Sequence, residues 1–310
     1  MSSSTKDPEE LAWWVALHSA QHVGPARFHR LVRRFGSPRN VLTNTTTDAL
    51  MAIPGADASL LDAIVFAGVR IDYTRKLVER LLERGVKIVT FDAPAYPEPL
   101  RKLKWPPGLL YVQGEFAPGD VRGIGIIGST QASARGFRAA YRSAGILASR
   151  GWTVVSGNAR GIDTAAHLGA IEAGGRTVFV LADGILHFRP QVQMAPGKIE
   201  RHAVVLSERP PEAPWEREGA LARNRITAAL CEKVFVVEAR ADNGTLHTFR
   251  LAKQMGIVTL AAAYKTDTPD GNLIAIRQGA VEVRSVAQLL EAVATEGEVR
   301  TETQQSFGWE

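Results

Sequence analysis

The stretch from Gly123 to His167, GIGIIGSTQASARGFRAAYRSAGILASRGWTVVSGNARGIDTAAH, decides the fold of this chain. Its first segment, 124–127, is rich in isoleucine and predicts a buried strand. The strand stops at the small-residue turn Gly128-Ser129, and a helical pattern follows over about 137–150. We therefore expect a strand, a tight turn and a helix in succession.

The second half of the stretch repeats this design. Residues 153–156 predict a second strand, 157–161 form a second turn, and a helix opens near Ile162. Tandem strand-turn-helix units predict a parallel sheet, whose strands all end at one edge and present backbone N–H groups there. Such an edge is a natural binding site for anions.

The glycines of the two turns have two interpretations. Gly128, Gly157 and Gly161 either let strands turn tightly into helices or let a phosphate approach the backbone. The first turn is not a Gly-x-Gly-x-x-Gly fingerprint, and the sequence contains no Gly-Lys-Ser or Gly-Lys-Thr. A phosphate site therefore needs residues from elsewhere in the chain.

Composition narrows the class of protein. The 310 residues suffice for one large or two ordinary domains, and no apolar run approaches the length of a membrane span. Cys231 is the only cysteine, so we expect that the protein works in a reducing cytoplasm and that this thiol is buried and unreactive. A net charge of +5 permits an acidic polymer as partner.

Arginines are frequent in the loops predicted at the carboxyl edge. These are Arg135, Arg160, Arg189, Arg223, Arg225 and Arg240. The segment Arg223-Asn224-Arg225 is predicted at a helix start, where two guanidinium forks and an amide suit a phosphate. The alternative is a structural ion pair from either arginine to Glu208 or Glu238.

Two further loop segments carry open alternatives. Asn243-Gly244-Thr245 precedes a predicted helix, where its N–H groups and hydroxyl suit a phosphate, although Asn and Thr are also ordinary capping residues. Phe188 either stacks on an unpaired base or holds its loop against the core.

The N-terminal part predicts several short helices. Its turns at 22–25 and 53–56 resemble degenerate helix-hairpin-helix turns, which favours a packing or partner-docking module over an independent DNA grip. A charged helix over 71–83 and a strand over 86–90 follow. We expect a loose leader over 1–7, a helical domain over 8–85, a sheet domain over 86–294 and a flexible tail over 295–310.

Five blocks of the sheet domain resemble the DprA/Smf DNA-processing family, in that family's order. They read SGNARGIDTAAHLGAIEAGGRTVFVL, LSERPP, RNRITAALCEKVFVVEA, NGTLHTFRLA and GNLIAIRQGA, and the upstream segment IVTFDAPAYPEPLRKLKWPPGLLYVQG extends the similarity. The resemblance covers about residues 10–293. It implies an extended Rossmann-like α/β domain preceded by a small all-α domain of the sterile-alpha-motif kind.

The resemblance also implies a function. It describes a cytoplasmic, non-catalytic protein that binds and protects single-stranded DNA, loads the RecA recombinase in natural transformation or recombination, and pairs into homodimers. No cofactor, metal or membrane is expected. The groove residues assigned on this basis are Gly128, Ser129, Arg135, Ser156, Gly157, Arg160, Gly161, Phe188, Arg223, Asn224, Arg225, Asn243, Gly244 and Thr245.

Departures from the family keep two alternatives open. Thr130 stands where the family's first turn has an arginine, and we expect no winged-helix domain after residue 293, which motivates a sensor of a small nucleotide. Asp163 and His167, four residues apart on one helix, form either an acid-base pair for nucleotide hydrolysis or a hydrogen-bonded support for the turn.

Overall fold

The computed structural model of the protein describes residues 6–191, 197–241 and 244–294. It separates into two compact units. The first comprises Met1–Gln113, Gly184–Leu186 and Ser207–Ala213, and the second comprises Gly114–Asp183, His187–Leu206 and Pro214–Glu310. The first unit is thus built from three separate stretches of chain.

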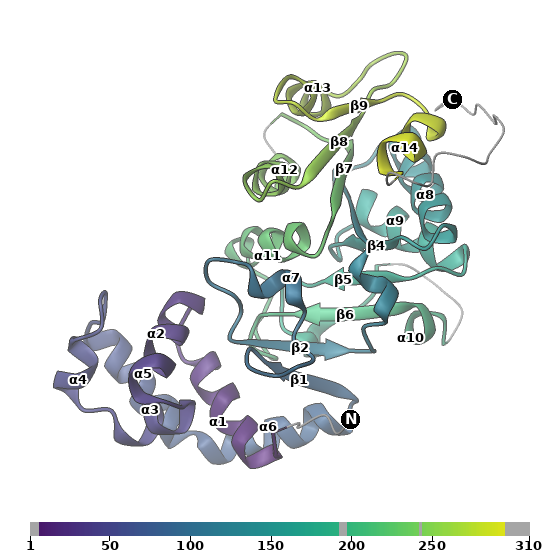
Figure 1. Ribbon diagram of the computed structural model, residues 1–310. Coiled ribbons are helices and arrows are strands. Elements are labelled where there is room, and N and C mark those ends of the chain that lie inside the picture. The colour runs from purple at the N-terminus through teal and green to yellow at the C-terminus, as the bar shows by residue number, and fades with distance from the viewer. Residues whose placement is uncertain (1–5, 192–196, 242–243, 295–310) are drawn as a thin grey trace. The chain divides into compact units, whose positions relative to one another are not determined.

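A parallel sheet forms the centre of the second unit (Figure 1). Its strands are β3 (Gly123–Gly128), β4 (Thr153–Ser156), β5 (Thr177–Val180), β6 (Ala203–Ser207), β7 (Lys233–Glu238), β8 (Val258–Ala262) and β9 (Val281–Val283). They lie in the order β6-β5-β4-β3-β7-β8-β9, and each neighbouring pair is parallel. The predicted α/β class with a Rossmann-like parallel sheet is confirmed.

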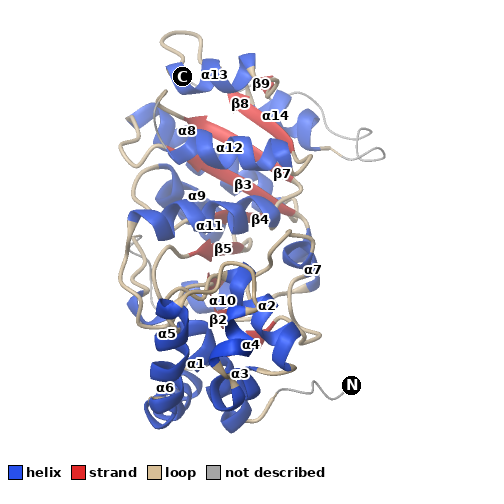
Figure 2. Cartoon of the chain, turned by 90° about the vertical axis from the view of Figure 1, so that its left-hand side faces the viewer, coloured by secondary structure: helices blue, strands red, loops and turns tan. Residues whose placement is uncertain are grey.

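Helices cover both faces of this sheet (Figures 1 and 2). On one face lie α8 (Ala134–Ser149), α9 (Ile162–Glu172) and α14 (Val286–Val293), and on the other α11 (Arg217–Ala229), α12 (Gly244–Gln254) and α13 (Asp270–Arg277). The short α10 (Lys198–His202) precedes β6. Because both faces are covered, the central strands are buried along their length and carry continuous apolar runs.

Small residues bring α8 and α9 close together. Their contact is rich in alanine, and a Cβ on Gly169 would overlap the backbone carbonyl of Tyr141. Ile124, Ile126 and Val154 from the sheet pack into the same core. This packing fixes where α9 begins, and so positions the turn between β4 and α9.

The first unit contains the α-helices and strands that precede residue 114. They are α1 (Pro8–Ser19), α2 (Pro25–Phe35), α3 (Pro38–Asn44), α4 (Thr47–Met51), α5 (Ala58–Val69), α6 (Ile71–Glu83), β1 (Val86–Thr90), α7 (Glu98–Arg101) and β2 (Leu109–Gln113). Strands β1 and β2 form an antiparallel pair. Four of these helices have an N-terminal cap, which explains where they begin. The capping side chains of α1, α3, α4 and α5 are those of Asp7, Ser37, Thr46 and Asp57.

Several predicted elements coincide with the observed ones. The strands over 86–90 and 153–156 and the helix over 71–83 have the predicted bounds. Helix α8 begins three residues before the predicted position because Ser133 caps it. The prediction that Arg223 opens a helix was wrong, since α11 begins at Arg217.

Two sets of predicted features are not tested. The leader up to residue 5 and the tail over 295–310 lie outside the described residues. The boundary at 85/86 also stays a prediction, while the compact first unit continues to Gln113. Within the described ranges, no helix is both long and apolar enough to cross a bilayer.

Candidate nucleic-acid interface

Three loops meet at the carboxyl edge of the sheet, because β3 lies between β4 and β7. The backbone N–H of Ser129, after β3, donates to the carbonyl of Glu238 at the end of β7 over 2.7 Å. The backbone N–H of Ile162 donates to the carbonyl of Ser129 over 3.1 Å. These bonds tie the three loops into one surface.

The turn glycines have a packing explanation. A Cβ on Gly128 would overlap the Ile162 side chain, and one on Gly161 would overlap the Ser129 carbonyl. Gly161 also has a φ of +76°, which favours glycine. The tight-turn interpretation therefore accounts for both residues without a ligand.

The anion position at the start of α8 is occupied from within. The Glu238 carboxylate accepts from the backbone N–H of Ser133 over 2.9 Å and from the Ser133 hydroxyl over 2.6 Å. That hydroxyl accepts in turn from the N–H of Gly136 over 3.0 Å. An internal carboxylate thus fills the place where a helix start would attract a phosphate.

The turn after β4 is supported by Arg223 and Asp163. A Cβ on Gly157 would collide with the Arg223 guanidinium and come within 2.5 Å of an Asp163 carboxylate oxygen. Arg223 Nη1 donates to the Val180 carbonyl over 2.5 Å. Burial raises the pKa of Asp163, and the positive charge of Arg223 opposes that rise. Arg223 therefore lies beneath the turn, beside a carboxyl group.

His167 holds the same turn from α9. Its Nε2 lies 2.5 Å from the carbonyl oxygen of Gly157, which only accepts, so this nitrogen carries the hydrogen. Its Nδ1 lies 2.7 Å from the Thr177 hydroxyl. Burial lowers the pKa of His167 to about 3. Both nitrogens are used internally, which supports the interpretation of His167 as a hydrogen-bonded support for the turn.

The arginine pair of α11 does not form the arrangement that a helix start would give. Arg223 and Arg225 lie in the middle of α11, where backbone N–H groups bond within the helix. Residues two apart on a helix do not face each other, so the two guanidinium groups leave different sides of α11. Arg225 is half-buried, and Asn224 between them is buried.

Arg135 does not take the place of the arginine that the first turn lacks. It donates to the carbonyls of Thr266 and Asp267 over 2.7 and 2.9 Å, and its guanidinium lies 4.3 Å from the centre of the Tyr264 ring. These contacts hold Arg135 to the loop between β8 and α13.

Phe188 packs on the core while keeping part of its ring accessible. Its ring meets that of Phe179 edge to face at 5.6 Å, and the residue is half-buried. The Asn158 side-chain amide donates to the carbonyl of Arg189 over 2.9 Å and so joins this loop to the turn after β4. The ring is thus anchored beside a predicted site loop.

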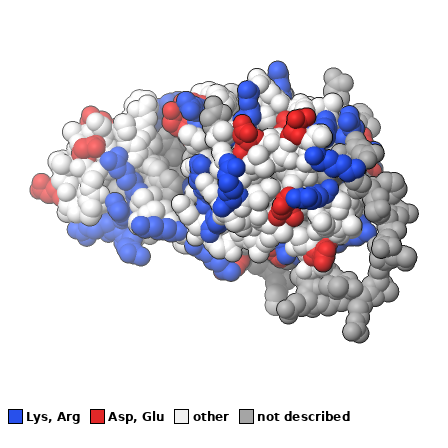
Figure 3. Space-filling model, turned by 90° about the horizontal axis from the view of Figure 1, so that it is seen from above, with Lys and Arg blue, Asp and Glu red and all other residues white. Residues whose placement is uncertain are grey.

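Exposed cations flank the loop after β3. Arg160 follows β4 and Arg240 follows β7, and both are exposed. Arg240 donates to the Gln131 side chain over 3.0 Å, whereas Arg160 has no partner among the described residues. In the view from above in Figure 3, Lys and Arg side chains are spread over the surface with Asp and Glu among them.

The remaining predicted residues are partly accessible. Gly244 is exposed at the start of α12, and Thr245 is buried. Asn243 lies outside the described residues. Ser156 is buried, and its hydroxyl donates to the Ile126 carbonyl over 2.7 Å, so it joins β4 to β3.

Some residues of this region were missed by sequence reasoning. Trp215, in the loop before α11, is 64% exposed and offers a second aromatic surface in this unit. Asn272 is fully buried, accepts from the N–H of Ala239 and donates to the carbonyls of Val237 and Ala262. A Cβ on Gly271 would collide with Ala239. The Gly-Asn pair of the last family block is therefore structural.

Cys231 is buried as predicted. Its thiol donates to the Thr227 carbonyl over 2.9 Å, and burial raises its pKa. Within the described part of the chain, no group of three His, Cys, Asp or Glu side chains is placed to hold a metal ion.

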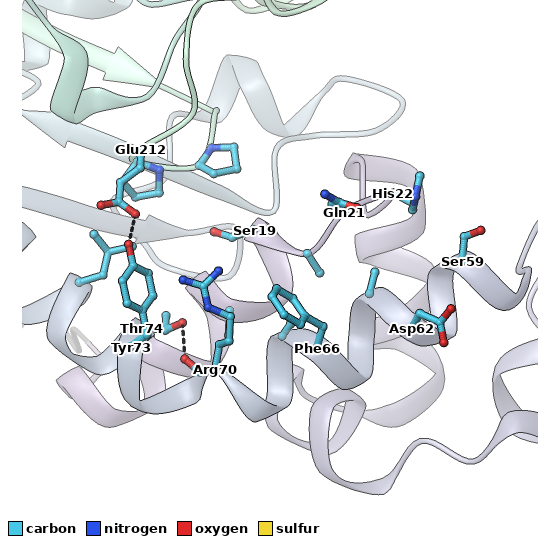
Figure 4. Close-up of a pocket in the computed structure, with 17 residues that line it drawn as sticks. Ser19, Gln21, His22, Ser59, Asp62, Phe66, Arg70, Tyr73, Thr74 and Glu212 are labelled. Carbon is cyan, nitrogen blue, oxygen red and sulfur yellow. Dashed lines mark hydrogen bonds between the residues drawn. The ribbon is translucent and has the colours of Figure 1, made fainter.

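A separate pocket of about 780 Å³ lies in the first unit (Figure 4). Helices α1, α5 and α6 and residues 210–212 line it. The Arg70 guanidinium lies over the rings of Phe66 and Tyr73, and the Tyr73 hydroxyl donates to Glu212. This pocket contains none of the predicted site residues.

Comparison with known proteins identifies the family. Residues 87–294 match the model of the family described as DNA recombination-mediator protein A. The chain is 30% identical over 292 residues to protein Smf of Synechocystis sp., covering 92% of this chain and 73% of that protein. It is 32% identical over 214 residues to DNA processing protein DprA of Bacillus subtilis, covering 67% and 72%.

Solved structures show the same fold. DNA processing protein A from Streptococcus pneumoniae superposes with a TM-score of 0.73 at 24% identity, covering 93% of this chain and 98% of that one. The Helicobacter pylori protein, whose structure was described for its single-stranded DNA binding mode, superposes at 0.57 with 21% identity, covering 67% and 95%. With the family model matching most of the sheet unit, the chain belongs to the DNA recombination-mediator protein A family, which includes the DprA and Smf proteins.

Proposed function

We propose that this protein binds single-stranded DNA along the carboxyl edge of its sheet. The observation that carries the proposal is the placement of exposed Arg160 and Arg240 on the two sides of the β3 loop. Neighbouring strands lie about 4.8 Å apart, so loops two strands apart are roughly 10 Å from each other. A strand of DNA crossing this edge meets a cation from each loop.

Other groups at the edge complete the proposed contact surface. Helix α12 begins with exposed Gly244, and the first N–H groups of a helix have no partners within it. The accessible part of Phe188 offers a face on which a base stacks. Phosphate contacts combined with sequence-tolerant stacking suit DNA of any sequence.

The family description supports a biological role. We propose that the protein protects incoming single-stranded DNA and loads the RecA recombinase on it during transformation or recombination, in the cytoplasm and as a homodimer. The family description as a recombination mediator supports this role, as does the single-stranded DNA binding described for the Helicobacter pylori relative.

A second candidate function is the sensing of a small nucleotide. It is favoured by Asn158, whose buried side-chain oxygen has no hydrogen-bond partner among the described residues at the turn after β4. Stabilisation of the protein by a mononucleotide alone, and not by dT oligomers, would favour this function over DNA binding.

The variant Arg160→Ala/Arg240→Ala tests the DNA-binding proposal. We expect at least tenfold weaker binding of a fluorescent dT oligonucleotide in an anisotropy titration. The slope of log K against log salt should flatten by about 1.4, because each lost phosphate contact contributes about 0.7 for a single strand.

The matched control is Arg138→Ala/Arg142→Ala, which removes two exposed cations from α8. The control should bind like the unaltered protein. Equal affinity and equal salt slope for the Arg160→Ala/Arg240→Ala variant and this control would overturn the proposed site.

A further inference from the structure

A second basic surface lies on the first unit. It is formed by α2 and by the segment between α7 and β2, and we call it the α2 patch. Its residues are Arg30, Arg33, Arg34, Lys102, Lys104 and Trp105. The sequence has no Asp or Glu over 25–47 or over 99–114, so both contributing segments are free of acidic residues.

Three contacts place the two segments side by side. The Arg30 guanidinium lies 5.3 Å from the centre of the Trp105 ring. His29 Nε2 lies 2.9 Å from the carbonyl oxygen of Pro106. A Cβ on Gly108 would overlap the Phe28 ring, so the chain passes directly against α2 there. The cations of the two segments therefore belong to one surface.

Four of the five cations in the α2 patch are exposed. Arg33, Arg34, Lys102 and Lys104 are exposed, and none of them forms an ion pair with a described residue. Arg33 and Arg34 follow Arg30 by three and four residues, so all three share one side of α2.

Like charges held together repel each other and favour binding of an anion. Trp105 adds an aromatic ring beside Arg30, and it is 36% exposed. Cations beside an accessible aromatic ring are the combination that binds single-stranded nucleic acid, in which phosphates meet the cations and bases stack on the ring. Binding of phosphates alone would not require the ring.

We propose that the α2 patch is a second contact region for single-stranded DNA. In this arrangement Arg33, Arg34 and the two lysines contact phosphates, and Trp105 stacks on a base. The inference rests on the proposed DNA binding and adds the helical unit to the surface that carries it.

The double variant Arg33→Ala/Arg34→Ala tests the proposal in the full chain. We expect three- to tenfold weaker binding of a 60-nucleotide dT oligomer, with a salt slope flatter by about 1.4. The matched control is Lys76→Ala/Arg84→Ala. It removes two exposed cations from the same unit, one on α6 and one directly after it. Thermal unfolding followed by circular dichroism verifies that all variants are folded.

Photochemical cross-linking provides a second readout. An oligomer carrying 5-iodouracil should form an adduct on the peptide that contains Trp105, and Trp105→Ala should abolish that adduct. An unchanged affinity and slope for Arg33→Ala/Arg34→Ala, a loss equal to that of the α6 control, or no adduct at Trp105 would each overturn the proposal. If the unaltered protein binds no oligomer, the proposed function itself fails, which is a different result.

Discussion

At the turn after β4, three side chains from two helices meet around one glycine. Asp163 and His167 come from α9 and Arg223 from α11, and all three lie close to Gly157. The positive charge of Arg223 favours the ionised form of Asp163 and so opposes the rise of its pKa on burial. His167 stays neutral because burial disfavours its charged form. Polar residues that resemble a catalytic group thus hold the backbone of a loop.

The buried neutral state of His167 predicts a pH dependence of stability. Its pKa is about 3 in the folded protein and near 6.5 when unfolded. The unfolded chain therefore binds the extra proton, so stability is fully present above pH 6.5 and falls as the pH falls towards 3. Between pH 7 and pH 5 this one group costs about 2 kcal/mol.

The variant His167→Gln isolates this contribution. We expect it to be less stable than the unaltered protein at pH 7.5 and to lose about 2 kcal/mol less on going from pH 7 to pH 5, measured by urea unfolding. His247→Gln, at an exposed position on α12, should keep the original pH dependence. A variant at His167 with the same pH dependence as the unaltered protein would contradict this account.

At the scale of elements, the start of α8 shows how the sheet satisfies a helix end. Glu238 is the last residue of β7, and its carboxylate accepts from both the backbone and the side chain of Ser133. The negative charge also complements the dipole of α8. The same position is therefore closed to a phosphate, which directs the proposed DNA contacts to the loops after β4 and β7.

Removal of this carboxylate should weaken the fold without weakening DNA binding. We expect Glu238→Ala to lower the free energy of unfolding by about 1 to 2 kcal/mol, since a helix cap and a favourable charge are lost together. Glu232→Ala removes an exposed carboxylate just before the same strand and should change stability little. Reduced oligonucleotide affinity in Glu238→Ala at a temperature where it is folded would argue against this assignment.

At the scale of the whole molecule, the first unit includes a segment of the chain that comes after strand β6 of the second unit. Residues 207–213 belong to it, and Glu212 accepts hydrogen bonds from Tyr73 and Arg80 of α6. The backbone N–H of Leu186 donates to the carbonyl of Pro211 over 3.1 Å. A cut at the predicted boundary thus separates residues that form one compact unit.

We expect a chain that starts at residue 86 to unfold at a lower temperature than the full chain. The segments 184–186 and 207–213 then lose the helices with which they are packed. Differential scanning calorimetry of the two proteins measures the difference. An unchanged unfolding temperature would show that residues 86–310 form an independent domain, as the sequence-based boundary predicts.

The sequence by itself determined the elements whose signals are local. The apolar pair inside 153–156 predicted β4 with its observed bounds, because the middle of a strand that is buried on both faces needs apolar side chains. The ordered blocks indicated the family, and the comparisons confirm it. Glycines at tight turns were also identifiable, since a Cβ there meets backbone atoms.

Tertiary structure alone decided how the charged residues of the site are used. Ser133 and Glu238 are 105 positions apart, and Arg223 reaches Val180 across 43 positions, so no local pattern links them. The start of α11 at Arg217 placed Arg223 and Arg225 in a helix interior, and packing then set how far each is buried. Whether an arginine binds a ligand or supports a loop depends on which partners the folded chain brings within reach, and those partners are distant in sequence.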